Sequence, residues 1–159
     1  MAQRARAFGM TIHYSDRVPL PDDVADGAVY HEDPHDLLRV SEFLSLHAPA
    51  TSDTNHFLNA DTIALLPHGA IVVNTARGDL IRDDDLFAAL ADGRVAAVGL
   101  DVFEHEPRID ARYLTLANAF LMPHLAAATI ETQTAIAMLA LDNIDAVLGD
   151  RQAPSLVTA

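Results

Sequence analysis

Three places in the sequence carry side chains that together suit acid–base chemistry on an anionic substrate. They are Arg77, Asp101 with residues 104–106 (Glu-His-Glu), and His124. A guanidinium presents a planar fork of donors that matches a carboxylate or a carbonyl oxygen. A carboxylate beside a histidine favours the imidazolium form and raises its pKa, which makes a useful proton donor near neutral pH. Such a set suits reduction of a 2-keto acid, in which hydride adds to carbon and a proton reaches oxygen.

Two of these residues also have a purely structural interpretation. Arg77 can tie down a loop through an ion pair, because charged networks often serve structure alone. His124 can be a loop histidine whose hydrogen bonds are satisfied by its neighbours. Residue type and spacing leave both interpretations open, so the choice depends on whether the chain brings these groups together.

The apolar runs predict an α/β fold with a parallel sheet. The expected strands lie at residues 11–14, 42–46, 70–74, 95–100 and 120–122. The expected helices between and after them lie at residues 1–8, 33–40, 59–66, 83–92 and 129–148. Apolar runs without alternation, separated by helices, are typical of strands in a parallel sheet that is buried on both faces.

Particular residues are expected to begin and end these elements. Asp83 and Thr129 are predicted to cap the last two helices, and Gly93 is predicted to end the first of those two. The segment 17–30, which contains two prolines and a glycine, is predicted to be a loop.

In this fold, the side chains that suit acid–base chemistry lie just after the ends of strands. Arg77 follows the strand at 70–74, Asp101 follows the next strand, and His124 follows the last one. Because ligands of open parallel sheets bind beyond the carboxyl ends of the strands, we expect one rim to carry these groups.

The composition argues against several partners. Ten Lys and Arg residues oppose 23 Asp and Glu residues, so the net charge of the 159-residue chain is −13. Such an acidic surface repels nucleic-acid phosphates and anionic lipid. The chain has no cysteine, which excludes disulfides and a thiol nucleophile. No signal peptide or membrane span is recognisable, so a cytoplasmic location is expected.

Four segments resemble the signatures of the D-isomer-specific 2-hydroxyacid dehydrogenases. They are residues 74–78 (Asn-Thr-Ala-Arg-Gly), 99–107 (Gly-Leu-Asp-Val-Phe-Glu-His-Glu-Pro), 123–125 (Pro-His-Leu) and 46–49 (Leu-His-Ala-Pro). Within the family, residues 6–17 look most like the glyoxylate/hydroxypyruvate reductase (glycerate dehydrogenase) branch. The resemblance implies a Rossmann-like parallel sheet with helices on both faces, and oxidation or reduction of 2-hydroxy acids with NAD or NADP.

The resemblance also implies roles for single residues. Arg77 would bind the substrate carboxylate and carbonyl, His124 would be the general acid and base, and Glu106 would hold His124 protonated. Asp101 would contact the nicotinamide end of the cofactor. The residues expected along the cofactor are Asp16, Arg17, Ala48, Pro49, Thr54, Thr75, Ala76, Arg77, Asp101, His124 and Ala126. No metal is implied.

Two residues leave the cofactor type open. Asp16 ends the first strand, where a carboxylate takes the ribose hydroxyls of NAD, whereas Arg17 suits the 2′-phosphate of NADP. We favour NAD, because Asp16 would repel that phosphate. Ala126 stands where the family has a glycine, so its methyl group is expected to crowd the cofactor.

The amino-terminal part of the nucleotide domain is missing from the expected pattern. No G-x-G-x-x-G occurs, and the sequence starts in a helix, so we expect a carboxy-terminal portion of a longer enzyme. Residues 1–128 would be a partial dinucleotide-binding domain, and residues 129–159 a helix and tail that return to a substrate domain. The absent strand would lie between the strand at 11–14 and the strand at 70–74 or its neighbour.

The loss of the phosphate loop has consequences for binding and assembly. The isolated chain is expected to bind cofactor weakly or not at all, because the cradle for the pyrophosphate is gone. The last helix would have an exposed apolar stripe or would take part in a homodimer. The alternative to an enzyme is a catalytically inactive remnant or interaction module of the same fold.

Other histidines are interpreted as structural. Residues 31–35 match the zinc motif H-E-x-x-H, but Pro34 disrupts the helix that this motif requires. His13, His47, His56 and His68 have no partner that the sequence reveals.

Overall fold

The computed structural model describes residues 1–156, and the chain divides into two compact units. The first unit is Met1–Leu121, and the second begins at Met122. None of the described helices is long and apolar enough to cross a lipid bilayer.

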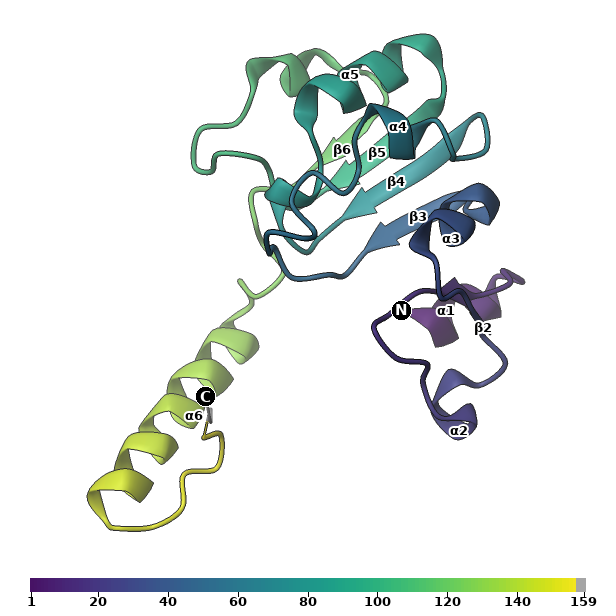
Figure 1. The fold of residues 1–159 in the computed structure, drawn as a ribbon. Coiled ribbons are helices and arrows are strands. Elements are labelled where there is room, and N and C mark those ends of the chain that lie inside the picture. Colours follow the sequence, from purple (N-terminus) through teal and green to yellow (C-terminus); the bar gives the residue numbers. More distant parts are fainter. Residues whose placement is uncertain (157–159) are drawn as a thin grey trace. The chain divides into compact units, whose positions relative to one another are not determined.

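A four-stranded parallel sheet forms the centre of the first unit (Figure 1). Its strands, in spatial order, are β3 (Phe43–Leu46), β4 (Ala70–Asn74), β5 (Val95–Leu100) and β6 (Ala119–Leu121). All neighbours are parallel, so the carboxyl ends of the four strands share one edge of the sheet. The Rossmann-like parallel α/β architecture expected from the sequence is confirmed.

A second, two-stranded parallel sheet lies in the segment before β3. It consists of β1 (His13–Tyr14) and β2 (Val29–Tyr30). The prediction of a loop at 17–30 was wrong, because α2 (Asp22–Ala25) and β2 lie there. Two strand residues are too few to leave a periodic pattern. This pairing depends instead on contacts across the sheet, such as the rings of Tyr14 and Tyr30, whose centroids are 5.3 Å apart.

The helices of the first unit come from the predicted segments, apart from α2 and two short 3-10 helices. They are α1 (Ala2–Ala7), α2, α3 (Pro34–Val40), α4 (Ala60–Ile63) and α5 (Asp83–Asp92), with short 3-10 helices at Gly78–Leu80 and Ala111–Thr115. In Figure 1, α4 and α5 lie together over the four-stranded sheet, and α5 packs on β5. Leu38, Leu58, Val72, Leu86 and Val95 are fully buried in the core between these layers.

The ends of the helices follow from side-chain caps, with one exception. Asn59 caps α4 with a capping box, and Gly93 ends α5 in a left-handed conformation with φ 80°. The prediction that Asp83 caps α5 was wrong, because Arg82 is the N-cap and makes no side-chain capping bond. The Asp83 carboxylate instead accepts a hydrogen bond from the hydroxyl of Tyr113 at 2.6 Å.

Burial along β4 alternates. Ala70, Val72 and Asn74 are buried, whereas Ile71 and Val73 are only half-buried. The prediction that this strand is buried on both faces is therefore confirmed for one face only.

The second unit contains one long helix, α6 (Ile130–Leu148). Thr129 caps it as predicted, because its hydroxyl accepts a hydrogen bond from the Thr132 amide at 3.1 Å. Apolar side chains remain exposed along the helix, namely Ile130, Ile136, Met138, Leu139, Leu141, Ile144, Val147 and Leu148. Of the tail expected up to residue 159, residues 157–159 lie outside the described residues.

Candidate functional site

Asn74 organises the turn at the carboxyl end of β4. Its side chain is fully buried, and its Oδ1 accepts a hydrogen bond from the Ala76 amide at 3.0 Å. Its Nδ2 donates to the carbonyl oxygen of Arg77 at 2.8 Å, and its own carbonyl accepts from the Asp101 amide at 3.0 Å. One buried amide therefore fixes the turn before Arg77 and joins it to the end of β5.

Arg77 is exposed at this strand end. Its Nη1 donates to the carbonyl oxygen of Ala76 at 2.6 Å. Within residues 1–156, its guanidinium forms no ion pair with a carboxylate, which removes the main support for a purely structural role. The remaining donors of the guanidinium can bind an anionic ligand.

The segment after β5 packs directly on the segment after β4. Asp101 is buried, and Glu106 Oε1 accepts a hydrogen bond from the Phe103 amide at 2.8 Å. A Cβ built on Gly78 would lie 2.0 Å from the carbonyl carbon of Phe103, so only glycine permits this approach. The neighbour of Arg77 and the residue that fixes Glu106 are thus in contact.

His124 lies at the start of the second unit, three residues after β6 ends. Its backbone is left-handed, with φ 54°. The segment after it is tied to the beginning of α6, since Gln133 Nε2 donates to the carbonyl oxygen of Ala127 at 2.6 Å. Ala126 lies in the same segment.

The expected cofactor residues occupy further strand ends. Asp16 follows β1, and its Oδ1 accepts a hydrogen bond from the Arg17 amide at 2.7 Å. Ala48 and Pro49 follow β3, and the Thr54 hydroxyl donates to the Pro49 carbonyl oxygen at 2.6 Å.

Thr75 and Ala76 follow β4, in the turn that Asn74 organises. In the first unit, the structure therefore places these residues after β1, β3, β4 and β5. His124 and Ala126 belong to the second unit.

This geometry can be compared with known proteins. Residues 1–126 match the family described as D-isomer specific 2-hydroxyacid dehydrogenase, NAD binding domain. The chain belongs to this dehydrogenase family. The resemblance seen in the sequence is confirmed, and so is the assignment to a nicotinamide cofactor.

Relatives of known sequence and structure support the same assignment. Glycerate dehydrogenase of Hyphomicrobium methylovorum is 46% identical over 151 residues, which are 94% of this chain and 47% of that protein. A glyoxylate reductase from Paecilomyes thermophila superposes with a TM-score of 0.89 at 39% identity, covering 99% of this chain and 47% of its own.

One solved relative was crystallised with its cofactor. The NADPH-dependent glyoxylate/hydroxypyruvate reductase from Sinorhizobium meliloti, in complex with NADP and malonate, has a TM-score of 0.91 at 32% identity. The match covers 99% of this chain and 48% of that one. The chain therefore spans about half the length of the relatives it matches.

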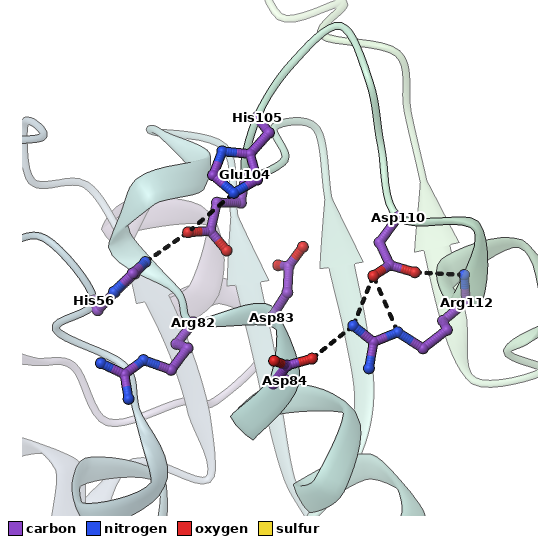
Figure 2. A pocket seen from close by; sticks show the side chains of 8 residues that line it. All are labelled: His56, Arg82, Asp83, Asp84, Glu104, His105, Asp110 and Arg112. Carbon is purple, nitrogen blue, oxygen red and sulfur yellow. Dashed lines mark hydrogen bonds and ion pairs between the residues drawn. The ribbon is translucent and has the colours of Figure 1, made fainter.

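A charged cavity of about 360 Å³ opens beside the loop after β5 (Figure 2). It is lined by His56, Arg82, Asp83, Asp84, Glu104, His105, Asp110 and Arg112. Two ion-pair groups make up its walls. Arg112 bridges Asp84 and Asp110 at 2.6 Å each, and His56 Nε2 lies 2.6 Å from Glu104 Oε1. No three His, Asp or Glu side chains within residues 1–156 are arranged to hold a metal ion.

The His56–Glu104 pair was missed in the sequence. His56 was interpreted as a structural histidine without a visible partner, yet it joins a carboxylate 48 positions away. Its backbone is left-handed, with φ 50°, and Figure 2 shows its ring directed toward Glu104. No local sequence pattern predicts a contact between positions so far apart in the chain.

Burial sets the ionisation of Asp83 in the cavity wall. Removal of water raises the pKa of the Asp83 carboxyl, the hydrogen bond from Tyr113 lowers it in part, and Glu104 and Asp110 raise it again. Burial also raises the pKa of Tyr113, and the bond to the Asp83 carboxylate adds to this shift. The tyrosine is therefore a hydrogen-bond donor at every physiological pH.

Replacing Tyr113 with phenylalanine is expected to destabilise the fold by about 1–3 kcal/mol at pH 7, because a half-buried carboxylate loses its donor. Because the pKa of the Asp83 carboxyl is raised in the folded state, ionisation of this carboxyl lowers the free energy of unfolding as pH rises through that pKa. In acid, where the carboxyl is protonated, this destabilisation is absent. The deficit of Tyr113→Phe should therefore shrink below that pKa. Urea unfolding between pH 4 and pH 8 measures it.

The matched control is Asp83→Asn, whose amide oxygen still accepts from Tyr113 but does not titrate. In the Asp83→Asn background, Tyr113→Phe should lower the free energy of unfolding by a smaller amount, and this amount should not vary with pH. An equal loss of stability at all pH values in the native background would contradict the role given to the carboxylate.

Proposed function

We propose that this chain is the nicotinamide-binding part of an enzyme that interconverts small 2-keto acids and 2-hydroxy acids. Glyoxylate and hydroxypyruvate are the keto acids we favour, since related proteins carry those names. The observation that supports this most strongly is Arg77. It is an exposed guanidinium at a parallel-strand end, and it has no carboxylate partner within residues 1–156.

Three residues would divide the work on the substrate. Arg77 binds the substrate carboxylate and polarises the carbonyl oxygen, which it can do with two parallel donors. His124 gives a proton to that oxygen in reduction and removes it in oxidation. Glu106 holds the His124 imidazole protonated and oriented. The nicotinamide, when bound, exchanges a hydride with the substrate carbon.

The residues present fit the nucleoside end of the cofactor. Asp16 stands at the end of β1 with one oxygen fixed by the Arg17 amide, which suits acceptance of ribose hydroxyls. Asp101, Ala48, Pro49, Thr54, Thr75, Ala76 and Ala126 would line the remainder. Residues 1–159 contain no glycine-rich loop for the pyrophosphate, which favours the alternative of a non-catalytic module for the chain alone.

Oxidation of NADH or NADPH with glyoxylate or hydroxypyruvate tests the proposal. The assay uses the chain alone and a chimera, in which this chain replaces the 151 matched residues of the Hyphomicrobium enzyme. We expect turnover in the chimera and little in the chain alone. A folded chimera that binds cofactor but reduces neither acid would favour the inactive module.

Replacing Asp16 with serine in the chimera is expected to shift the preference from NADH toward NADPH by about 10- to 100-fold. Removal of the negative charge ends its repulsion of the 2′-phosphate, worth about 1–3 kcal/mol. The ratio of kcat/KM for the two cofactors measures the shift. Asp22→Ser, an equal charge change in the exposed α2, should leave the ratio unchanged. A preference that does not move with Asp16 would refute its place at the ribose.

Assembly and location complete the proposal. The exposed apolar side chains of α6 favour a homodimer, and the absence of cysteine is compatible with the cytoplasm. Sedimentation equilibrium of the chimera tests the dimer.

A further inference from the structure

His56 joins three segments that follow strands of the central sheet. It lies in the loop after β3, and its backbone amide donates to the Asp79 carbonyl oxygen at 2.7 Å. Asp79 belongs to the short 3-10 helix that begins directly after Arg77. The His56 ring contacts the loop after β5, where its Nε2 donates to Glu104 Oε1 at 2.6 Å. One residue therefore links the segment that carries Arg77 to the segment that carries Glu106.

The backbone beside this link is also fixed. The Leu58 amide donates to the Leu80 carbonyl oxygen, and the Arg82 amide donates to the Leu58 carbonyl oxygen, both at 2.9 Å. These bonds form an isolated parallel bridge two residues after His56. The loop that holds His56 is thus paired with the chain just after Arg77, so a displacement of one segment is expected to displace the other.

Glu104 connects His56 to the loop after β5. The Glu104 amide nitrogen takes part in the close approach to Gly78, where an added Cβ would come within 2.4 Å of it. The Phe103 amide, one residue earlier, donates to Glu106 Oε1 at 2.8 Å. The same short stretch of backbone therefore packs on Gly78, fixes Glu106 and is held by His56.

The His56–Glu104 pair is partly shielded from water. The two side chains are 27% and 14% exposed. A hydrogen bond to a carboxylate in such a place is stronger than one at the surface. His105 is 78% exposed, and its Nε2 lies 3.8 Å from the same carboxylate oxygen, which is too far for a hydrogen bond.

The arginines of the cavity are engaged with other carboxylates. Arg112 bridges two aspartates of the cavity wall, and the Arg82 Nε lies 3.8 Å from Asp85 Oδ2. Figure 2 shows the His56 ring directed at the Glu104 carboxylate. His56 is therefore the cavity side chain that holds Glu104.

The backbone of His56 supports a role for its side chain. Its φ of 50° lies in the left-handed region, which glycine adopts without cost and other residues adopt rarely. Such conformations persist where surrounding contacts hold the residue in place, and they are frequent at functional sites. Here the contacts are the bond to the Asp79 carbonyl oxygen and the bond to Glu104.

We propose that His56 is a positioning residue for the reaction at Arg77 and Glu106. Through Glu104, it holds the loop after β5 against the segment after β4. It thereby fixes the distance between the group that binds the substrate and the carboxylate that orients His124. The inference rests on the proposed function, because it uses the roles given there to these residues. Loss of alignment should lower kcat more than it changes KM, because Arg77 still binds the substrate carboxylate while proton transfer loses its geometry.

Variants of the chimera test this by reduction of glyoxylate. His56→Gly keeps the backbone amide and suits the left-handed conformation but removes the ring. We expect kcat to fall by about tenfold or more, and KM for glyoxylate to change by less than about threefold. His56→Gln places an amide donor at a similar reach and should restore kcat to within about threefold of the unmodified chimera. The control is His68→Gly, which removes an exposed histidine before β4 and should leave both constants unchanged.

A double-mutant cycle identifies the partner of His56. Glu104→Ala should lower kcat about as much as His56→Gly, and the double variant should be no slower than either single variant. If His56→Gly fails to fold by circular dichroism, Glu104→Ala and His56→Gln provide the comparison with the unmodified chimera.

Hydrogen exchange of the chain alone tests the positioning without a measurement of turnover. The Phe103 amide should exchange about tenfold faster in His56→Gly than in the unmodified chain. The amides inside β4 should exchange at unchanged rates, which separates release of the loop from a general loss of stability.

Four results would overturn the inference. They are an unchanged kcat in folded His56→Gly, no recovery of kcat in His56→Gln, additive losses in the double variant, and exchange at the Phe103 amide that is unchanged or matched in β4. If the unmodified chimera reduced neither acid, the proposed function would fail instead, and the exchange measurement would still decide whether His56 holds the loop.

Discussion

Replacing Arg77 with glutamine in the chimera is expected to lower kcat/KM for reduction of glyoxylate by about 10²- to 10³-fold. Glutamine is uncharged and cannot present two parallel donors, so both the substrate carboxylate and the developing negative charge on oxygen lose a partner. Loss of one such donor in other enzymes costs about 10²–10³ in rate. Both kcat and KM should change, because the same group binds the ground state and the transition state.

The matched control is Arg82→Gln. Arg82 is another exposed arginine, whose only ion pair within residues 1–156 is a distant one, with 3.8 Å between its Nε and Asp85 Oδ2. It changes the net charge equally, but we expect kcat/KM to stay within about twofold, because long-range effects of an exposed charge are screened. Equal losses in both variants would mean that charge, and not position, explains the effect. No loss in Arg77→Gln would remove the main support for the proposed function.

Replacing Gly78 with alanine is expected to cost about 3 kcal/mol or more of folding free energy. The new Cβ would lie 2.0 Å from the carbonyl carbon and oxygen of Phe103 and 2.4 Å from the Glu104 amide nitrogen. These are backbone atoms, which cannot rotate away as a side chain does, so the whole segment must move. The same shift would displace Glu106, whose carboxylate is fixed by the Phe103 amide.

Gly99→Ala is the control for this substitution. Its Cβ would meet only the methyl groups of Val73, at 3.8 and 4.0 Å, which is ordinary contact. We expect its stability to change by less than about 1 kcal/mol, as measured by urea unfolding. If Gly78→Ala were as stable as Gly99→Ala, the close approach of the two segments would be wrong.

The sequence alone was sufficient for the sheet and the family. Strands such as β4 and β5 are runs of apolar residues between helical segments, and this local pattern predicts buried strands of a parallel sheet. The motif at residues 74–78 also predicted Arg77 as a candidate substrate-binding residue. The structure added the reason why this motif contains Asn74 and Gly78. The buried amide fixes the turn, and the glycine admits the Phe103 backbone.

Other features depended on contacts between distant positions. Asp83 has the residue type of a helix cap, but Arg82 occupies the cap position, and the hydroxyl of Tyr113, thirty positions later, donates a hydrogen bond to the Asp83 carboxylate. β2 exists because it pairs with β1, and His56 acquires a role only through Glu104.

The sequence by itself therefore determined the strands of the four-stranded sheet, most of the helices and the family, because these follow from periodicity, residue type and motifs. Only the tertiary structure decided which buried polar groups pair and how the strands divide between two sheets. The free energy of those choices comes from packing between segments far apart in the chain.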